Sequence, residues 1–190
     1  VLPDLDDEFA SMASELDTVE ELRDDLRRRL AVVKRNQVAA ELREATAAAL
    51  GDLVDEELPE ALVENELQRG LQDLALRLGA QGIELGTYLQ AIGQDPEELR
   101  TQMREGAERS VRVDLALRAV ATAEGLEVDD DELDAEIAAA AERMGQSPAK
   151  LRAEFERNAQ LAAVRSDLRT RKAMEWVLER VEAVDHDGGP

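Results

Sequence analysis

The sequence has no cysteine among its 190 residues. Disulfides, thiolate nucleophiles and thiolate metal sites are therefore excluded. Long apolar runs are missing as well, since none approaches the roughly 20 residues of a membrane-spanning helix. No signal peptide is visible either. The absence of cysteine fits the cytosol, so we expect a cytoplasmic location, and the lack of a membrane span predicts no membrane partner.

The sequence also lacks the short signatures of common enzymes. It contains no G-x-G-x-x-G, no P-loop and no G-x-S-x-G, so nucleotide binding and serine hydrolysis have no support. Its one histidine, His186, lies in a predicted tail. The many carboxylates single out no catalytic pair. We therefore expect no catalytic residue, no metal site and no cofactor, and an enzyme is the weakest of the functions considered.

One acidic run superficially resembles a calcium-binding loop. Residues 129–132 are all acidic, but the glycine needed at position six of such a loop would fall at Asp134, and position five at Leu133. Carboxylates at the start of a helix are stabilised by the positive end of its dipole. The run therefore predicts a helix N-terminus rather than a calcium site.

Basic residues are outnumbered, and the formal net charge is −21. Such a surface repels phosphate backbones, so we expect no nucleic-acid partner. The basic residues gather in two segments: residues 22–43 have a net charge of +4 and residues 157–180 one of +3, which leaves −28 for the rest. We expect these two segments to lie together in one body and the middle of the chain to present an acidic surface. The alternative, given equal weight, is that each segment is a solvated helix face.

The first of these segments contains the densest basic run. Its members are Arg27, Arg28, Arg29, Lys34 and Arg35. Two interpretations are open: contact with an acidic partner, or pairing with the chain's own acidic helices. We favour the second.

Alanine and leucine supply most of the hydrophobic fraction of 44%, and both are strong helix formers. Only four residues are aromatic: Phe9, Tyr88, Phe155 and Trp176. Every long segment repeats its apolar residues with a period near 3.6, and none alternates as a strand does. The sequence therefore predicts an all-α fold with a thin core, which suits elongated helical layers.

The longest predicted helix covers residues 18–54, with Thr18 and Glu21 as a capping box at its start. It carries two apolar stripes that face different sides and change over near Gln37. The first stripe is Leu22, Leu26, Leu30 and Val33, and the second is Val38, Leu42, Ala45, Ala49 and Leu53. We interpret this helix as a strut between two contact regions.

Shorter helices fill the rest of the chain. Capping residues, prolines and glycines predict their ends. The predicted elements are a short helix after Asp6 with Phe9 and Met12 as its apolar residues, then helices over 59–78, 86–92, 96–124 and 129–144, one starting at Ser147 and Pro148, one over 159–184, and a tail at 186–190.

Six stretches, taken in order, resemble the C-terminal chaperone domain of bacterial trigger factor. They are LPDLDDEFA (2–10), DTVEELRDDLRRRL (17–30), ELPEALVENEL (57–67), YLQAIGQDPEELR (88–100), AEGLEVDDDELDAEI (123–137) and NAQLAAVRSDLRTRKAMEWVLE (158–179). The resemblance extends over residues 2–184, and the order and spacing follow the family throughout. The piece GLEVDDDELDAEI is also similar to SurA-type chaperones, which share this helical domain.

The resemblance implies one all-α domain over residues 1–190, an elongated multi-helix body with a long spine helix and two helical arms. The body would be about 1–57 and 158–184, the arms about 58–124 and 125–157, and the tail 185–190. Family members hold nascent or unfolded polypeptides between arms and body without ATP.

Full-length family members also have a ribosome-docking domain with a G-F-R-x-G-K-x-P signature and a prolyl isomerase domain. Neither is found in this sequence. We therefore expect no isomerase activity from this chain and ribosome contact only through that other domain.

Apolar residues of the middle helices are the candidate client contacts. Leu62, Leu76, Val111 and Leu115 lie off the main stripes, and the alternative for each is core packing. The full candidate set is Leu62, Leu67, Leu71, Leu74, Leu76, Met103, Val111, Leu115, Ile137, Met144 and Phe155. We predict an ATP-independent chaperone module for unfolded or nascent polypeptides, with a weak homodimer as a further association. The rival hypothesis is a helical scaffold that binds one fixed protein partner.

Overall fold

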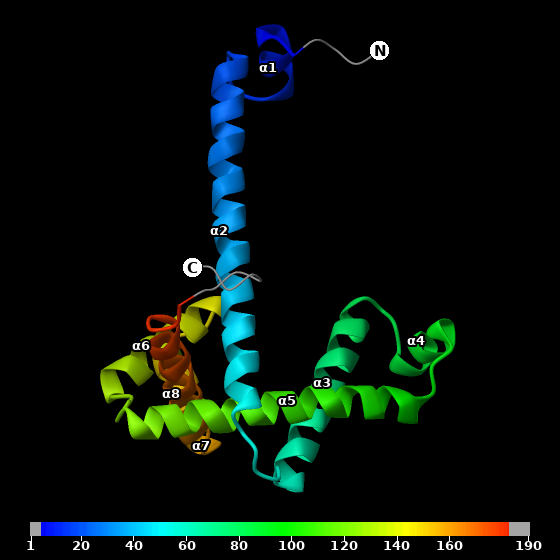
Figure 1. The fold of residues 1–190 in the computed structure, drawn as a ribbon, viewed down its shortest axis with the longest axis vertical. Coiled ribbons are helices and arrows are strands. Elements are labelled where there is room, and N and C mark those ends of the chain that lie inside the picture. The colour runs from blue at the N-terminus through cyan, green and yellow to red at the C-terminus, as the bar shows by residue number, and fades with distance from the viewer. Residues whose placement is uncertain (1–4, 183–190) are drawn as a thin grey trace. The chain divides into compact units, whose positions relative to one another are not determined.

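The computed structural model describes residues 5–182. Over that range the chain forms α-helices and no strand, which confirms the all-α prediction (Figure 1). The helices are α1 (Asp7–Ala13), α2 (Val19–Asp52), α3 (Glu60–Ala80), α4 (Leu85–Ile92), α5 (Pro96–Ala123), α6 (Asp130–Arg143), α7 (Pro148–Arg157) and α8 (Leu161–Leu178). None of these helices combines the length and apolarity that crossing a membrane requires. His186 and the predicted tail lie outside the described residues.

The helix starts follow the capping residues of the sequence. At α6 the Asp129 carboxylate accepts a hydrogen bond from the Glu132 N–H at 2.8 Å, and the Glu132 carboxylate accepts one from the Asp129 N–H at 3.0 Å. Asp95 and Glu98 form the same reciprocal box at the start of α5, and α2 begins with the predicted box as well. The acidic run at 129–132 is therefore a helix start, as predicted.

The last helix ends earlier than predicted, at Leu178 rather than near residue 184. The Arg180 guanidinium donates to the Trp176 carbonyl at 2.8 Å, and the Arg180 backbone N–H bonds to the Val177 carbonyl at 2.9 Å instead. At the end of the helix the Trp176 carbonyl thus accepts from the Arg180 side chain and not from the Arg180 N–H.

Contacts between Cα atoms divide the chain into two compact units, residues 1–44 and residues 45–190. The first contains α1 and most of α2, and the second contains the last turns of α2 together with α3 to α8. These units do not test the division into a body and two arms, which stays a prediction.

In the first unit, α1 is tied to the start of α2. The Asp7 carboxylate accepts a hydrogen bond from the Val19 N–H at 2.9 Å, and Ala10 and Val19 are buried. Of the two large apolar residues of this short helix, Phe9 is half-buried and Met12 is 72% exposed. The small side chain of Ala10 supplies the buried face.

The first predicted stripe of α2 is exposed over most of its length. Leu22 is half-buried, while Leu26, Leu30 and Val33 are 47%, 57% and 60% exposed. The described part of the first unit consists of α1 and α2 alone, so no further helix of that unit covers the stripe. The packed contact predicted for this stripe is therefore not found within the first unit.

The basic run next to this stripe pairs inside α2. Arg27 contacts Asp24 at 2.7 Å, and Asp25 is contacted by Arg29 at 2.6 Å and by Arg28 at 3.7 Å. These residues are three or four positions apart, the spacing at which side chains meet on one helix face. Arg27, Arg28 and Arg29 therefore pair with acidic neighbours of their own helix. Pairing with the other acidic helices of the chain stays a prediction.

The second predicted stripe misses the face that α2 buries in the second unit. Ala45, Ala49 and Leu53 are exposed, whereas the residues on the buried side are Thr46, Ala47, Leu50 and Gly51. A Cβ at Gly51 would lie only 3.2 Å from Val113 Cγ2, so α2 meets α5 through a glycine. Glycine adds nothing to an apolar stripe, and for that reason the sequence pattern indicated the wrong face.

Three apolar clusters form the core of the second unit. They are Val63, Leu67, Ala107 and Val111 between α3 and α5; Leu117, Ala121, Ala173 and Met174 between α5 and α8; and Leu133, Ile137, Ala141, Leu151 with their neighbours among α6, α7 and α8. α5 thus packs on α3 along one part of its length and on α8 along another (Figure 1). Helical spacing predicts an apolar stripe on α3, and all its members are buried or half-buried: Val63, Leu67, Leu71, Leu74 and Leu78. The first three of them belong to the cluster between α3 and α5.

Candidate functional site

An apolar groove of about 610 Å³ lies in the second unit, where α2 ends and the chain crosses to α3. Its lining residues are Leu50, Leu53 and Val54 at the end of α2, Glu56, Glu57 and Pro59 in the connection, and Leu115, Ala116, Ala119 and Val120 on α5. The methyl side chains of Ala116 and Ala119 are too short to fill the space between the larger residues. The groove is therefore hollow at α5 and apolar on both sides.

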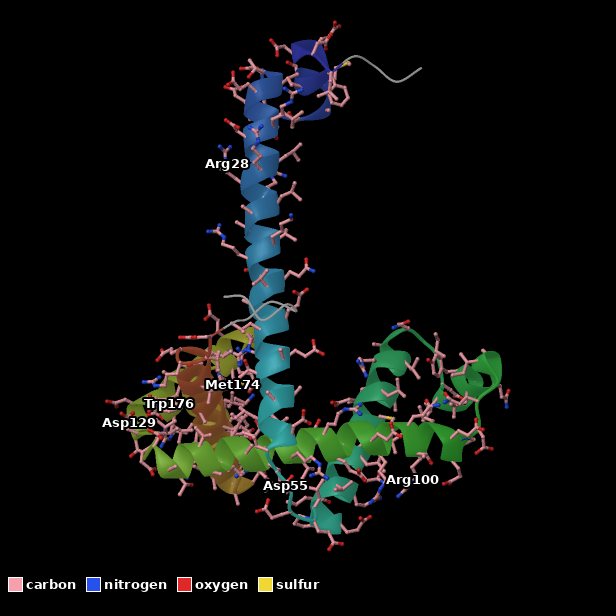
Figure 2. The ribbon with its side chains drawn as sticks, viewed as in Figure 1. Arg28, Asp55, Arg100, Asp129, Met174 and Trp176 are labelled. Carbon is pink, nitrogen blue, oxygen red and sulfur yellow. The ribbon has the colours of Figure 1, made fainter. Side chains whose placement is uncertain are left out.

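Local contacts hold the connection beside α5. The Arg112 guanidinium donates to the Val54 carbonyl at 2.5 Å. Leu58 packs against the cluster between α3 and α5, and Pro59, with ψ of 117°, keeps the backbone extended up to the first residue of α3. Asp55, labelled in Figure 2, marks this connection between the two helices. The groove thus follows from a helix that stops at Asp52 and a proline that delays the next one.

The charge of the groove is acidic. Glu56 and Glu57 are its only charged lining residues, and both are exposed. Asp52 and Asp55 are exposed neighbours in the chain. A ligand that places an apolar side chain in the groove would therefore bind more tightly if it also carried a positive charge at the acidic rim.

The structure places the eleven predicted contact residues in very different environments. Leu67, Val111 and Ile137 are buried; Leu71, Leu74, Met103, Leu115 and Phe155 are half-buried; and Leu62, Leu76 and Met144 are exposed, at 41%, 72% and 59%. The three buried residues belong to the core clusters, so they have no surface to offer a ligand in this conformation. Of the eleven, only Leu115 lines the apolar groove. A binding role for the other residues stays a prediction.

Sequence reasoning missed most of the groove. Leu53 and Val54 were assigned to the strut, and Ala116 and Ala119 give no signal of their own. One pattern points to the site: an apolar pair at the end of a helix, followed by three acidic residues and then, after Leu58, by Pro59.

The basic residues of α8 are engaged with the segment between α5 and α6. The consecutive carbonyls of residues 126–128 each accept a hydrogen bond from a different α8 cation. The donors are, in that order, Arg169 at 2.6 Å, Lys172 at 2.7 Å and Arg165. We call these three cations and three carbonyls the α8 clasp. The predicted position of this basic segment beside residues 22–43 stays a prediction.

Cations of α8 also bind carboxylates of α6. The pairs are Arg165 with Asp130 (2.5 Å), Lys172 with Glu132 (2.6 Å) and Arg171 with Glu136 (2.9 Å). In each pair, the hydrogen bond from the cation holds the pKa of the carboxyl below its ordinary value. Electrostatics therefore reinforce the apolar packing between α6 and α8.

A second hollow, of about 470 Å³, lies beside the clasp and is lined by four arginines. They are Arg118, Arg152, Arg165 and Arg169. Each already donates to a carboxylate, a carbonyl or the Ser166 hydroxyl. These arginines are occupied within the fold, and the apolar groove remains the candidate site.

Comparison with known proteins gives a consistent result. The family described as the C-terminus of bacterial trigger factor protein matches residues 18–179. Trigger factor of Geobacillus sp. (strain WCH70) is 38% identical over 179 residues, which are 94% of this chain and 41% of that protein. Trigger factor of Saccharopolyspora erythraea is 38% identical over 187 residues, with 98% and 40% covered. For Bacillus subtilis (strain 168) the values are 37% over 179 residues, 94% and 42%. The chain spans about two fifths of the length of these curated relatives.

Two solved structures share the fold. Domains of trigger factor from Thermotoga maritima give a TM-score of 0.57 at 22% identity, over 75% of this chain and 83% of that chain. The second is a structure of the trigger factor chaperone from work on promiscuous substrate recognition in its folding and assembly activities. It gives a TM-score of 0.53 at 24% identity, over 96% of this chain and 44% of that chain. At these identities the likeness is one of fold. The family match covers most of the sequence, and this chain therefore belongs to the trigger factor family, whose C-terminal region it matches.

Proposed function

We propose that this chain is an ATP-independent chaperone module that holds segments of unfolded or nascent polypeptides. The apolar groove between α2, the connection and α5 is the observation that supports the proposal. Leu53, at its edge, is 76% exposed, although it is a large apolar residue. Exposed apolar surface of this kind marks interaction sites.

The energy of such binding comes from reversible burial of apolar side chains. Full burial of a leucine or phenylalanine side chain contributes about 1.5–3 kcal/mol, so each single contact is weak enough for release. Several such contacts on one client add avidity. Leu62, Leu76 and Met144 are exposed and would supply further contacts of this type.

Suppression of aggregation tests the proposal. A chemically denatured protein is diluted into buffer without nucleotide, and light scattering is followed with and without the 190-residue chain. We expect the chain to suppress scattering and Leu53→Gln to weaken this severalfold. Leu30→Gln changes a leucine that is 57% exposed but lies outside the groove, so an equal effect of the two variants would assign the activity to exposed apolar surface in general and not to the groove. Failure to suppress scattering even at large excess would contradict the proposal.

The second candidate function is a helical scaffold for one fixed protein partner. A peptide array separates the two. Many hits rich in apolar residues support a chaperone, whereas one sharp motif supports the scaffold.

The proposal extends to location and association. It places the module in the bacterial cytoplasm, assigns ribosome contact to other parts of trigger factor, and includes a weak homodimer. Sedimentation velocity over a range of protein concentrations would detect that dimer. The division into a body and two arms remains part of the same proposal.

A further inference from the structure

The connection after α2 has main-chain groups without a protein partner among the described residues. The backbone N–H and C=O groups of residues 55–58 form no hydrogen bond within that part of the chain. The neighbouring Val54 and Pro59 carbonyls, by contrast, accept hydrogen bonds from Arg112 and from the start of α3. Residues 55–57 are exposed. This short non-helical segment is therefore an open edge of polypeptide next to the apolar groove.

An open edge beside an apolar groove suits an extended ligand. An extended peptide can pair its own main chain with such an edge, and its alternate side chains then point to the same side. A helical ligand has its N–H and C=O groups already paired internally, so the free groups of residues 55–58 would contribute nothing to its binding. The acidic rim adds a charge preference, because Glu56 and Glu57 attract basic side chains.

Resting on the proposed function, we propose that the groove binds an extended segment of an unfolded polypeptide through its backbone. Main-chain groups of the client pair with residues 55–58, an apolar side chain enters the groove that Leu53 and Leu115 line, and a neighbouring lysine or arginine faces Glu56 and Glu57. Pairing through the main chain does not depend on the client sequence. The groove therefore accepts many clients while requiring only one apolar and one basic side chain.

Backbone methylation of a peptide tests this mode of binding. The probe is an N-acetylated octapeptide amide of alternating leucine and lysine, together with versions that carry one N-methyl group at each successive amide. We expect N-methylation to raise Kd about fivefold at alternate amides, those that face residues 55–58, and to leave the amides between them unchanged. Amide hydrogen exchange of the 190-residue chain should slow at one or more of residues 55–58 when the parent peptide is bound.

The outcomes separate this proposal from the proposed function. If every N-methylated peptide binds as the parent does and exchange at 55–58 is unchanged, while Leu53→Gln still weakens binding, the groove binds side chains only and the backbone proposal is overturned. A helix-stapled version that binds more tightly than the parent overturns it as well. If Leu53→Gln binds the parent peptide as tightly as the unmodified chain does, the groove itself is not the site, and both proposals fail.

Discussion

Gly51 determines how closely α2 approaches α5. A Cβ at this position would lie 3.2 Å from Val113 Cγ2 and 3.7 Å from Arg112 Cβ. We expect Gly51→Leu to lower the free energy of unfolding by about 1–3 kcal/mol, because the added methylenes overpack this contact. Urea unfolding followed by circular dichroism measures the change.

Gly79 offers a matched control for this substitution. It lies in α3, and a Cβ built there meets nothing within 4 Å. Gly79→Leu should leave stability unchanged or raise it by up to about 1 kcal/mol, because leucine is the better helix former. Equal stability of the two variants would show that the approach at Gly51 is not tight.

The carboxylates of α6 that face α8 make stability depend on acidic pH. The pKa values of Asp130, Glu132 and Glu136 are lowered in the folded chain by hydrogen bonds from Arg165, Lys172 and Arg171, from ordinary values of 3.8 for aspartate and 4.5 for glutamate. A lowered pKa adds stability that is complete above the ordinary value and is lost as the pH falls through the folded value. We expect the urea midpoint to fall between about pH 5 and about pH 3.

Replacing one of these carboxylates tests that origin of the pH dependence. Glu136→Gln should show a smaller fall in the urea midpoint with acid, because one of the linked protonations is gone. Glu105→Gln is the control, since Glu105 forms no ion pair within the described residues. If both variants followed the pH dependence of the unmodified chain, the α6–α8 ion pairs would not contribute to it.

The three hydrogen bonds of the α8 clasp hold the segment between α5 and α6 against α8. Arg169 donates to the Leu126 carbonyl at 2.6 Å and to the Ala121 carbonyl at 3.2 Å. Arg169→Met keeps most of the apolar stem but leaves both carbonyls without this partner. We expect a loss of about 1–3 kcal/mol and faster amide hydrogen exchange in α6, measured by urea unfolding and NMR. Arg109→Met, at an exposed site on α5, should change neither quantity.

Most helix bounds were predictable because their signals are local, although α8 ends at Leu178, before its predicted end. The box of Asp95 and Glu98 and the left-handed Gly125, with φ of 61°, delimit α5 within a residue or two of the predicted range. The side of α2 that packs was not predictable, because its contact is made through Gly51. Local chemistry therefore identifies the helices but not all of their packed faces.

The candidate site was hard to predict for a related reason. Apolar periodicity finds the buried face, so it selected Leu67 and Ile137, which lie in the core. The groove instead depends on where the end of α2 crosses α5, a long-range relation between Leu53 and Leu115 that no local pattern encodes. Sequence reasoning therefore predicted an apolar binding surface but did not single out most of the residues that line the groove.

The net charge of −21 is a property of the whole chain, and it bears on both solubility and ligand preference. A strongly charged surface keeps a loaded complex apart from other complexes, which favours solubility. Under the proposed function, it would also attract unfolded segments that carry lysine or arginine beside their apolar residues. Because such attraction acts through solvent over several ångströms, it should be screened by salt, whereas apolar burial should not.

Two peptides with the same apolar residues, one with lysine and one with glutamate at the flanking positions, separate these contributions. At about 0.05 M NaCl we expect the lysine peptide to bind more tightly by about tenfold, and at about 0.5 M NaCl most of that difference should vanish. Fluorescence anisotropy of labelled peptides measures both Kd values.

A double variant, Glu56→Gln with Glu57→Gln, tests whether the rim of the groove is the source of this preference. If it is, the variant should show a smaller preference for the lysine peptide at low salt and should bind the glutamate peptide no less tightly. A preference that persists unchanged in this variant would assign the attraction to the general acidic surface, and equal binding of the two peptides at low salt would contradict electrostatic selection altogether.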